Sequence, residues 1–532
     1  MLRKLKKFYL CLLSAILLIL SFPRLELSAL AWFSFIPFFW ALDGVHPRGA
    51  IFLGYLTGVI FFAGTLYWFI HVTLPGAILL VLYLAVYFAL FALVYILWSP
   101  RKIKAGLEPS DSPPTRERGI QERLFLLPAA WVALEFIRGH LMTGFGWVSL
   151  GHSQYKNLGL IQIADLTGMY GVSYIVMMAN VFFKELLDFR GNNSPLKKKE
   201  IKVSAFIVFC LLIGSQVYSF FQLRDLERPP KIKVAVVQAN IPQSMKWNPA
   251  FHDSIMERQV ILTREAAKER PELVIWPETS FPGYVWESPE LFQGLKSFVA
   301  GIKIPLLFGL VVRDSSQDSE DYFNSAMLIS SHGEVLKRYD KLHLVPFGEY
   351  IPLRNVFPFL SGIVPIGDFT AGKKYTLFPA SVPIGDRDSV PTHFLNILIC
   401  FEDTIAELSR EFALQGSNLF VNITNDAWFL DTNAPFLHLQ ASVFRTIENR
   451  RGLIRAANTG VSCFINRHGE IFDFVHDRHH RKTYVPGFAV QEIPLNTVQT
   501  FYTKYGDIFT YLCFGSILWG MINPKKWRQA HV

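Results

Sequence analysis

The sequence predicts an α/β domain inserted into a bundle of membrane-spanning helices. The chain has 532 residues, of which 51% are hydrophobic, and it is too long and too apolar for a single soluble domain. Long apolar runs fill roughly the first 225 residues and return once near the C-terminus. Between them, short β-branched runs alternate with amphipathic segments, which is typical of layered α/β domains.

Eight apolar runs are candidate membrane spans, although some are short or interrupted. They are Phe8–Phe22, Leu25–Leu42, Ala50–Ile70, Gly76–Trp98, Leu124–Ile137, Leu160–Leu187, Val203–Phe221 and, after a long gap, Tyr505–Met521. The basic segment Arg3–Lys7 before the first run also fits a signal peptide, with cleavage near Ala29-Leu30-Ala31. Because that cleavage site lies inside the second apolar run, an uncleaved span is the better interpretation.

The distribution of basic residues predicts the orientation of the chain. With the N-terminus in the cytoplasm, the inner segments carry roughly six times as many Lys and Arg residues as the short outer connections. We therefore expect a seven-span domain over residues 1–228, an extracytoplasmic domain over 229–498, and a last span with a short cytoplasmic tail over 499–532. The net charge of +9 reflects this bias and requires no nucleic-acid partner.

The extracytoplasmic domain alternates between strand and helix patterns. Runs rich in β-branched residues predict strands, and runs with a period of 3.6 residues predict amphipathic helices. We expect strands at Lys233–Ala239, Leu273–Trp276, Leu306–Val312, Phe323–Ser330, Leu395–Ile399, Leu419–Ile423, Val461–Asn466, Glu470–Phe474 and Gly487–Glu492, and helices at His252–Lys268, Glu290–Val299, Thr404–Leu414 and Phe436–Arg455. This order suits two packed sheets with helices outside them.

A single cysteine follows the strand Leu395–Ile399. Cys400 would lie at the carboxyl end of that strand, where α/β architectures place ligands, and two carboxylates come directly after Phe401. A cysteine in that place is a candidate nucleophile. Taken alone, however, Cys400 fits a small buried core residue better.

Two further segments end in charged residues that complete a reactive group with Cys400. The strand Leu273–Trp276 leads through a proline to Glu278, and Lys341 precedes an apolar turn. Each residue alone is more simply a turn or surface residue. Together they supply what a thiol nucleophile needs: Glu278 as the base, and Lys341 with the amides after Cys400 as stabilisers of the oxyanion.

Cysteine and histidine usage indicates no metal site. His343, His393 and His438 are too scattered in the sequence for a zinc pattern, so we expect no metal and no cofactor. Cys400 and Cys463 are the cysteines outside the expected spans. We expect both to stay reduced, because a disulfide at Cys400 would abolish the chemistry; a redox bridge between them is the alternative.

These motifs resemble a known superfamily. The segments Trp276–Glu278, Tyr339–Lys341 and Ile399–Asp403 carry a Glu-Lys-Cys set similar to that of the carbon–nitrogen hydrolases, or nitrilases. The resemblance implies a nitrilase-like αββα four-layer sandwich. With the spans, the chain resembles the membrane-embedded branch of that superfamily, the apolipoprotein N-acyltransferase family, over essentially its whole length. The further matching segments are Glu135–Trp147, Gly151–Gln154, Gln238–Trp247, Phe347–Pro352 and Asn422–Trp428.

The resemblance implies an activity and a location. An acyl chain would pass from a phospholipid to a thioester on Cys400, and then to the α-amino group of an S-diacylglyceryl cysteine at the start of an apolipoprotein. The protein would lie in the bacterial inner membrane with its catalytic domain in the periplasm. Supporting and substrate-binding residues are implied as well, namely Glu349, Glu402, Phe401, Trp247 and Tyr350. For Glu402 a plain structural role in a turn is an equal alternative, and core packing explains an aromatic residue equally often.

Two loops near the expected site draw attention. The apolar, proline-containing segment Phe347–Gly367 is either a lid that dips into lipid or a loop that packs on the spans. The segment Trp428–Pro435 departs from the family pattern Trp-Phe-Gly-Asp-Ser followed by Gly-Pro, because Leu430 and Ala434 replace the two glycines. We expect this loop to be stiffer than in the family.

Two other functions compete with acyl transfer. A membrane-anchored amidase or hydrolase would use the same three residues with water as the acceptor, although an anchor needs one helix and not eight. A transporter or scaffold with a degenerate sensor domain is the other alternative. Transport paths usually need buried ionisable groups, and the expected spans carry few charges.

Overall fold

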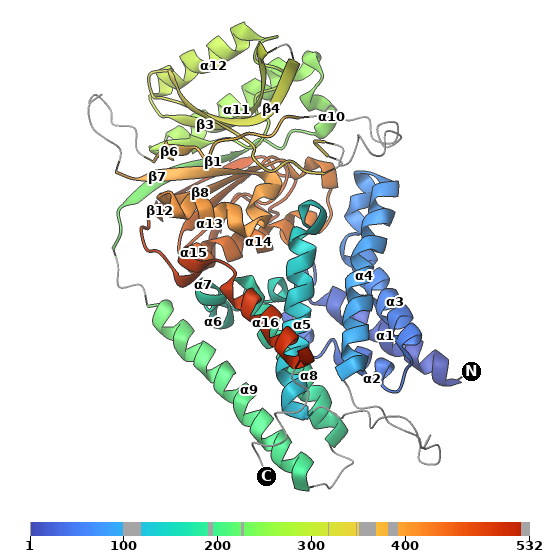
Figure 1. Cartoon of the computed structure of the whole chain (residues 1–532). Helices are drawn as coiled ribbons and strands as arrows, with labels where there is room; N and C mark the ends of the chain where they lie inside the picture. Colours follow the sequence, from blue (N-terminus) through green and yellow to red (C-terminus); the bar gives the residue numbers. More distant parts are fainter. Residues whose placement is uncertain are drawn as a thin grey trace. The chain divides into compact units, whose positions relative to one another are not determined.

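The chain divides into two compact units. The computed structural model describes residues 2–98, 119–189, 195–224, 228–317, 319–346, 348–350, 369–380 and 392–522 (Figure 1). The helical unit comprises residues 1–224 and 505–532, and the α/β unit comprises residues 225–504. Each unit has its own buried core.

The helical unit contains helices of very different lengths. The longer helices are α1 (Leu2–Leu20), α3 (Pro47–Thr65), α4 (Leu74–Trp98), α5 (Ile120–His140), α8 (Met169–Phe189), α9 (Pro195–Gln222) and α16 (Ile508–Ile522), and the short ones are α2 (Ile36–Leu42), α6 (Leu158–Ile161) and α7 (Ala164–Thr167). Within the described ranges, α3, α4, α5 and α9 are long and apolar enough to cross a membrane. The expected count of eight spans is therefore not confirmed.

Two of the expected spans are interrupted. The run Leu25–Leu42 contains a 3-10 turn at Ser28–Trp32 before the seven-residue α2. The run Leu160–Leu187 breaks at Gly168, whose φ of 64° separates α7 from α8. Glycine adopts a positive φ without steric cost, so the sequence permits the break, but apolar composition alone does not reveal it.

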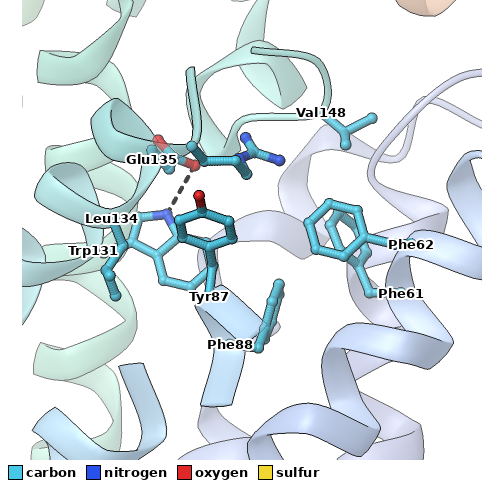
Figure 2. A pocket seen from close by; sticks show the side chains of 9 residues that line it. Phe61, Phe62, Tyr87, Phe88, Trp131, Leu134, Glu135 and Val148 are labelled. Atoms are coloured by element: carbon cyan, nitrogen blue, oxygen red, sulfur yellow. Dashed lines mark hydrogen bonds between the residues drawn. The ribbon is translucent and has the colours of Figure 1, made fainter. Parts of the chain in front are cut away.

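Two charged residues near the C-terminal end of α5 hold the following segment against that helix. Glu135 is 4% exposed and accepts hydrogen bonds from Trp131 Nε1 at 2.9 Å and from the backbone N–H of Leu150 at 2.6 Å. Arg138 donates to Ser149 Oγ at 2.8 Å. Figure 2 shows Glu135 and Trp131 beside a small cavity, which has a volume of about 20 Å³ and largely aromatic walls. Since unpaired buried polar groups are costly, such contacts explain how an apolar helix tolerates the two charges.

Among the described residues, the α/β unit contains two six-stranded sheets. Their strand orders are β12-β1-β2-β3-β4-β5 and β11-β10-β9-β8-β7-β6. The strands are β1 (Lys231–Gln238), β2 (Leu273–Ile275), β3 (Leu306–Gln317), β4 (Ser319–Ile329), β5 (Val335–Asp340), β6 (Leu377–Pro379), β7 (Phe394–Ile399), β8 (Ser417–Thr424), β9 (Gly452–Ala457), β10 (Cys463–Ile465), β11 (Ile471–Phe474) and β12 (Gly487–Pro494). Parallel pairing of β1 with β2, and of β8 with both β7 and β9, places the carboxyl ends of these strands at common edges.

Helices cover the outer faces of the two sheets (Figure 1). These are α11 (His252–Ala267) and α12 (Pro289–Ile302) on the first sheet, and α13 (Ala406–Leu414) and α14 (Ala434–Asn449) on the second. Alternate residues of β1 face opposite sides, as the pleat requires. Val234 and Val236 join the core between the sheets, whereas Ala235 and Val237 face the helices. The layer order is therefore αββα, and the predicted nitrilase-like four-layer sandwich is confirmed.

Three local expectations differ from the structure or lie outside it. The helix expected at Phe436–Arg455 is wrong at its C-terminal end, because α14 ends at Asn449 and the fully buried β9 follows. An all-buried parallel strand shows no alternation, so its run is easily joined to a preceding helix. Strands β5 and β6 were not predicted. Apart from residues 348–350, the lid candidate Phe347–Gly367 lies outside the described residues.

The loop that departs from the family pattern contains a strained leucine. The 3-10 turn η8 (Asp426–Phe429) is followed by Leu430, which has φ 52° and ψ −165° and is 51% exposed. This backbone region suits glycine, and other residues held in it carry strain of about 1–3 kcal/mol. The glycine of the family pattern would adopt it without strain.

We predict that Leu430→Gly leaves the protein as stable as the wild type or stabilises it by up to about 1 kcal/mol. Relief of backbone strain offsets the entropy that glycine adds to the unfolded chain, and a half-exposed leucine contributes little burial. Leu336→Gly in β5, where the leucine is 38% exposed and φ is negative, is the matched control and should destabilise. Thermal unfolding in detergent measures both; equal destabilisation of the two variants would contradict the prediction.

Candidate active site

Cys400 lies at the carboxyl end of β7 and opens the 3-10 turn η7 (Cys400–Thr404). Its φ of 54° is left-handed, an uncommon conformation for a cysteine. The carbonyl oxygen of Cys400 accepts hydrogen bonds from Asn422 Nδ2 at 3.0 Å and from His438 Nε2 at 3.2 Å. The turn is therefore held by side chains of β8 and α14.

Glu278 follows β2, two residues after Trp276, and crosses closely over β3. A Cβ added to Gly309 of β3 would lie 2.7 Å from the Glu278 Cα, so only glycine allows this approach. The two carboxylate oxygens of Glu278 accept hydrogen bonds from Asn324 Nδ2 and from the backbone N–H of Asn425, both at 2.8 Å. These two donors fix the orientation of the carboxylate.

Lys341 follows β5 and its side chain is only 1% exposed. Its Nζ lies 2.8 Å from Glu349 Oε2 and 3.9 Å from Glu278 Oε1. Burial alone would lower the pKa of Lys341, but Glu349 and Glu278 together raise it above its ordinary value. The ammonium is therefore charged at neutral pH. Asn324 Nδ2 also donates to Glu349 Oε1 at 2.8 Å, so one amide bridges both carboxylates.

The thiol of Cys400 interacts electrostatically with both of these charged residues. Burial raises the pKa of Cys400 and Glu278 raises it further, whereas Lys341 lowers it; the net shift is upward. The structure therefore brings Glu278, Lys341, Glu349 and Cys400 into one electrostatic group. A neutral thiol beside a carboxylate and an ammonium is able to transfer its proton when it attacks.

Glu402 connects the turn of Cys400 with the turn of Lys341. Its carboxylate accepts hydrogen bonds from the backbone N–H groups of Leu342 (2.7 Å), His343 (3.0 Å) and Ile399 (2.7 Å), and from Tyr339. Burial raises the pKa of Glu402 to about 7, although Lys341 and these donors favour the charged form. Glu402 thus links the segment after β5 in the first sheet with the end of β7 in the second.

The three aromatic candidates occupy different surroundings. Phe401 is largely buried, and its ring centroid lies 6.4 Å from that of His343. Trp247 is 42% exposed, with its ring centroid 5.6 Å from that of Tyr284. Tyr350 is half-buried and forms a β-bridge with Pro346. Only Phe401 directly adjoins the cysteine in the chain.

Several residues around the site were missed by sequence reasoning. Asn324 lies inside a predicted strand, where a single polar residue carries no distinct signal. Lys246, next to Trp247, is buried and donates to the Glu278 carbonyl at 3.1 Å and to Thr279 Oγ1 at 3.0 Å. Burial lowers the pKa of Lys246 to about 8, although Glu278 opposes this shift. His438 appeared only as one of several scattered histidines.

The sandwich, with a cysteine, a lysine and a glutamate at its strand ends, defines a member of the carbon–nitrogen hydrolase class. The family model described as "Carbon-nitrogen hydrolase" matches residues 233–501. An amidase from Nesterenkonia sp. is a structural neighbour with 17% sequence identity and a TM-score of 0.38, covering 54% of this chain and 98% of the amidase.

A second family model identifies the branch of that class. The model described as "Apolipoprotein N-acyltransferase N-terminal domain" matches residues 14–182. The apolipoprotein N-acyltransferase of Geobacter metallireducens is 37% identical over 96% of this chain and 93% of its own length. That of Chlorobaculum tepidum is 29% identical over 96% and 95%. The chain belongs to the apolipoprotein N-acyltransferase family.

We predict that the stability difference between the wild type and Glu402→Gln depends on pH. The folded protein holds the Glu402 proton up to about pH 7, whereas the ordinary pKa is 4.5. The stabilisation from this proton is complete below pH 4.5 and is lost as the pH rises through 7. The wild type should therefore lose up to about 3 kcal/mol relative to the non-titrating variant over that range.

Denaturant unfolding of both proteins between pH 4 and pH 8 measures this difference. Glu407→Gln, at an exposed position on α13, controls for the loss of one carboxylate. The raised pKa would be contradicted if the free energy of unfolding of the wild type, minus that of Glu402→Gln, stayed constant or increased as the pH rises.

Proposed function

We propose that this chain transfers an acyl chain from a phospholipid to the α-amino group of the N-terminal S-diacylglyceryl cysteine of apolipoproteins, through a thioester on Cys400. The observation that carries the proposal is the buried group of Glu278, Lys341 and Cys400 at the strand ends of the sandwich. The names of the relatives support the acceptor class. The chain covers more than nine-tenths of both relatives, so the proposal extends to the whole protein.

In the first half-reaction, Glu278 takes the thiol proton as Cys400 attacks the ester carbonyl of the phospholipid. A base is needed because the pKa of the Cys400 thiol is raised. The negative charge that forms on the carbonyl oxygen is stabilised by Lys341 and by backbone amides after Cys400. The C–O bond then breaks, and Glu278 returns its proton to the departing lysophospholipid oxygen.

In the second half-reaction, the neutral amine of the apolipoprotein attacks the thioester. Glu278 takes a proton from the nitrogen, and the C–S bond breaks as the amide forms. The same proton then passes to the sulfur, which restores the Cys400 thiol. No ATP is required, because a thioester is more reactive toward amines than the oxygen ester from which it came. Two successive transfers through one nucleophile give ping-pong kinetics.

The supporting residues receive roles from their contacts. Glu349 orients Lys341 and balances its charge, since it is the nearer of the two carboxylates. Glu402 positions the Cys400 turn through its bonds to backbone N–H groups of both sheets. Phe401, Trp247 and Tyr350 contact the acyl chain or the acceptor. The exposure of Trp247 supports its part in this role.

We place the protein in the bacterial inner membrane, with the catalytic domain on the periplasmic side. The excess of basic residues in the alternate connections supports this orientation. The domain limits proposed are 1–228, 229–498 and 499–532. Acceptors of the proposed kind carry two acyl chains, so an enzyme embedded in the bilayer meets both substrates where they reside.

We predict that Cys400→Ala abolishes acyl transfer and acyl-enzyme formation. Incubation of the purified wild type with phospholipid should add one hydroxylamine-labile acyl mass to Cys400, and this mass should move to the amine of a diacylglyceryl-cysteine peptide. Intact-protein and peptide mass spectrometry measure both steps. Cys210→Ser, at an exposed cysteine of α9, is the matched control and should keep both.

Three outcomes would contradict this mechanism. If the wild type formed no adduct with phospholipid, the thioester intermediate would be excluded. An adduct on Cys400→Ala would place the nucleophile elsewhere. Loss of the acyl group to water as fast as to the peptide would favour a membrane-anchored hydrolase.

A further inference from the structure

A fully buried polar network lies directly under the cysteine turn. Asp403 of η7, Asp426 of η8, His438 of α14 and Arg455 of β9 all have no exposed side-chain surface. Arg455 Nη1 donates to Asp403 at 3.0 Å, and Arg455 Nη2 lies 3.3 Å from Asp426. Burial alone would raise the pKa values of Asp403 and Asp426. His438 and Arg455 nevertheless lower both pKa values below the ordinary value of an aspartate. Four elements thus meet in one charge-paired group.

The contacts of His438 place a proton on Nε2. That nitrogen is 2.7 Å from Asp403 Oδ1 and 3.2 Å from the Cys400 carbonyl oxygen, and a carboxylate or carbonyl oxygen is able only to accept. His438 Nδ1 lies 2.7 Å from Arg455 Nη2 and 3.3 Å from Asp426 Oδ1. Burial would lower the pKa of His438, but the two aspartates raise it above its ordinary value. In either protonation state, His438 Nε2 donates to Asp403 and to the backbone of Cys400.

The same arginine orients the second donor to that carbonyl. Asn422 Oδ1 accepts from Arg455 Nη1 at 2.8 Å, which leaves Asn422 Nδ2 to donate to the Cys400 carbonyl at 3.0 Å. In the opposite amide orientation, Asn422 Nδ2 would face the Arg455 guanidinium, and two donors would then oppose each other. Both donors to the Cys400 carbonyl are thus held by Arg455.

The two hydrogen bonds to the Cys400 carbonyl also determine the direction of the Phe401 N–H. The peptide between Cys400 and Phe401 is planar and trans, so the N–H of Phe401 points away from the carbonyl of Cys400. That carbonyl faces the buried network. The N–H of Phe401 therefore faces the opposite side of the peptide, and it is the first donor of a turn whose leading amides have no partners within the turn.

We propose that His438, Asn422 and Arg455 are positioning residues that hold the Cys400–Phe401 peptide so that the Phe401 N–H donates to the oxyanion during acyl transfer. This inference rests on the proposed role of Cys400 as the acyl-accepting nucleophile. The network also stabilises the left-handed conformation of Cys400, since a strained backbone persists only where its surroundings fix it. None of the three side chains is required to contact the substrate.

The matched variants are His438→Gln and His438→Asn. The amide nitrogen of glutamine reaches about as far as the histidine Nε2 and keeps the donor to the Cys400 carbonyl. The shorter asparagine imitates Nδ1, so it keeps the contact with Arg455 but loses that donor. Both variants are polar and neutral, and they differ in which contact of His438 they keep, the one with the Cys400 carbonyl or the one with Arg455.

Comparing the rate of thioester formation with the rate of Cys400 alkylation distinguishes a misoriented oxyanion donor from a general disruption of the site. Formation of the thioester from phospholipid creates an oxyanion, whereas alkylation of Cys400 by iodoacetamide creates none. We expect His438→Asn to form the thioester roughly 10- to 100-fold more slowly than the wild type, because loss of one oxyanion donor costs about 100- to 1000-fold and misorientation costs part of that. His438→Gln should stay within about threefold of the wild type. Alkylation rates and thermal midpoints should be similar in the two variants.

Several results would overturn the inference. Thioester formation at the wild-type rate in both variants, or an equal loss in both, would show that the donor to the Cys400 carbonyl is not needed. A parallel fall in alkylation and thioester formation would show that the network merely supports the fold of the site. A wild type without any thioester would instead contradict the proposed function itself, so the two failures are distinguishable.

Discussion

The buried ammonium of Lys341 is the interaction on which the rest of the site depends. An unpaired charge in a protein interior costs several kcal/mol, so a lysine that is 1% exposed needs carboxylate partners. Glu349 and Glu278 supply them, and two neighbouring carboxylates in turn need a shared donor, which is Asn324. The ends of β2 and β5 and the middle of β4 therefore form one electrostatic unit. Removing Lys341 leaves two buried carboxylates without a cation, and removing Asn324 takes away the donor that both share.

Cys400, the proposed nucleophile, belongs to the other sheet, so its position relative to Lys341 depends on how the two sheets pack. Glu402 makes this connection directly, because it binds backbone N–H groups after β5 and at the end of β7. The core between the sheets, including Ile275 and Ile399, supports the same register with apolar contacts. Changes in sheet packing would thus shift Cys400 relative to Lys341, and small displacements of reacting groups slow catalysis.

Sequence patterns predicted the sandwich and the residues at its strand ends, but not what holds them. Cys400 and Glu278 each follow an apolar run, and Lys341 precedes an apolar turn, so their positions were visible in the chain. The shared amide of Asn324 was not, because a hydrogen bond between distant strands leaves no periodic signal. The boundary at Asn449 was missed since Arg450, and not glycine, takes the left-handed φ of 49° that ends α14. Some spans were expected to be interrupted, but the places where they break were not predicted, because hydropathy measures composition and not backbone conformation.

In the proposed reaction, the raised pKa of Cys400 affects both half-reactions. A neutral thiol does not attack until Glu278 accepts its proton, so the reactivity of Cys400 depends on that carboxylate. The same high pKa makes the sulfur a poor leaving group, which slows attack of water and of an amine on the thioester alike. An amine is a stronger nucleophile than water and, when held beside Glu278, gains from its fixed orientation. Preference for the apolipoprotein over water therefore comes from the nucleophile and its placement, and not from the pKa of the thiol.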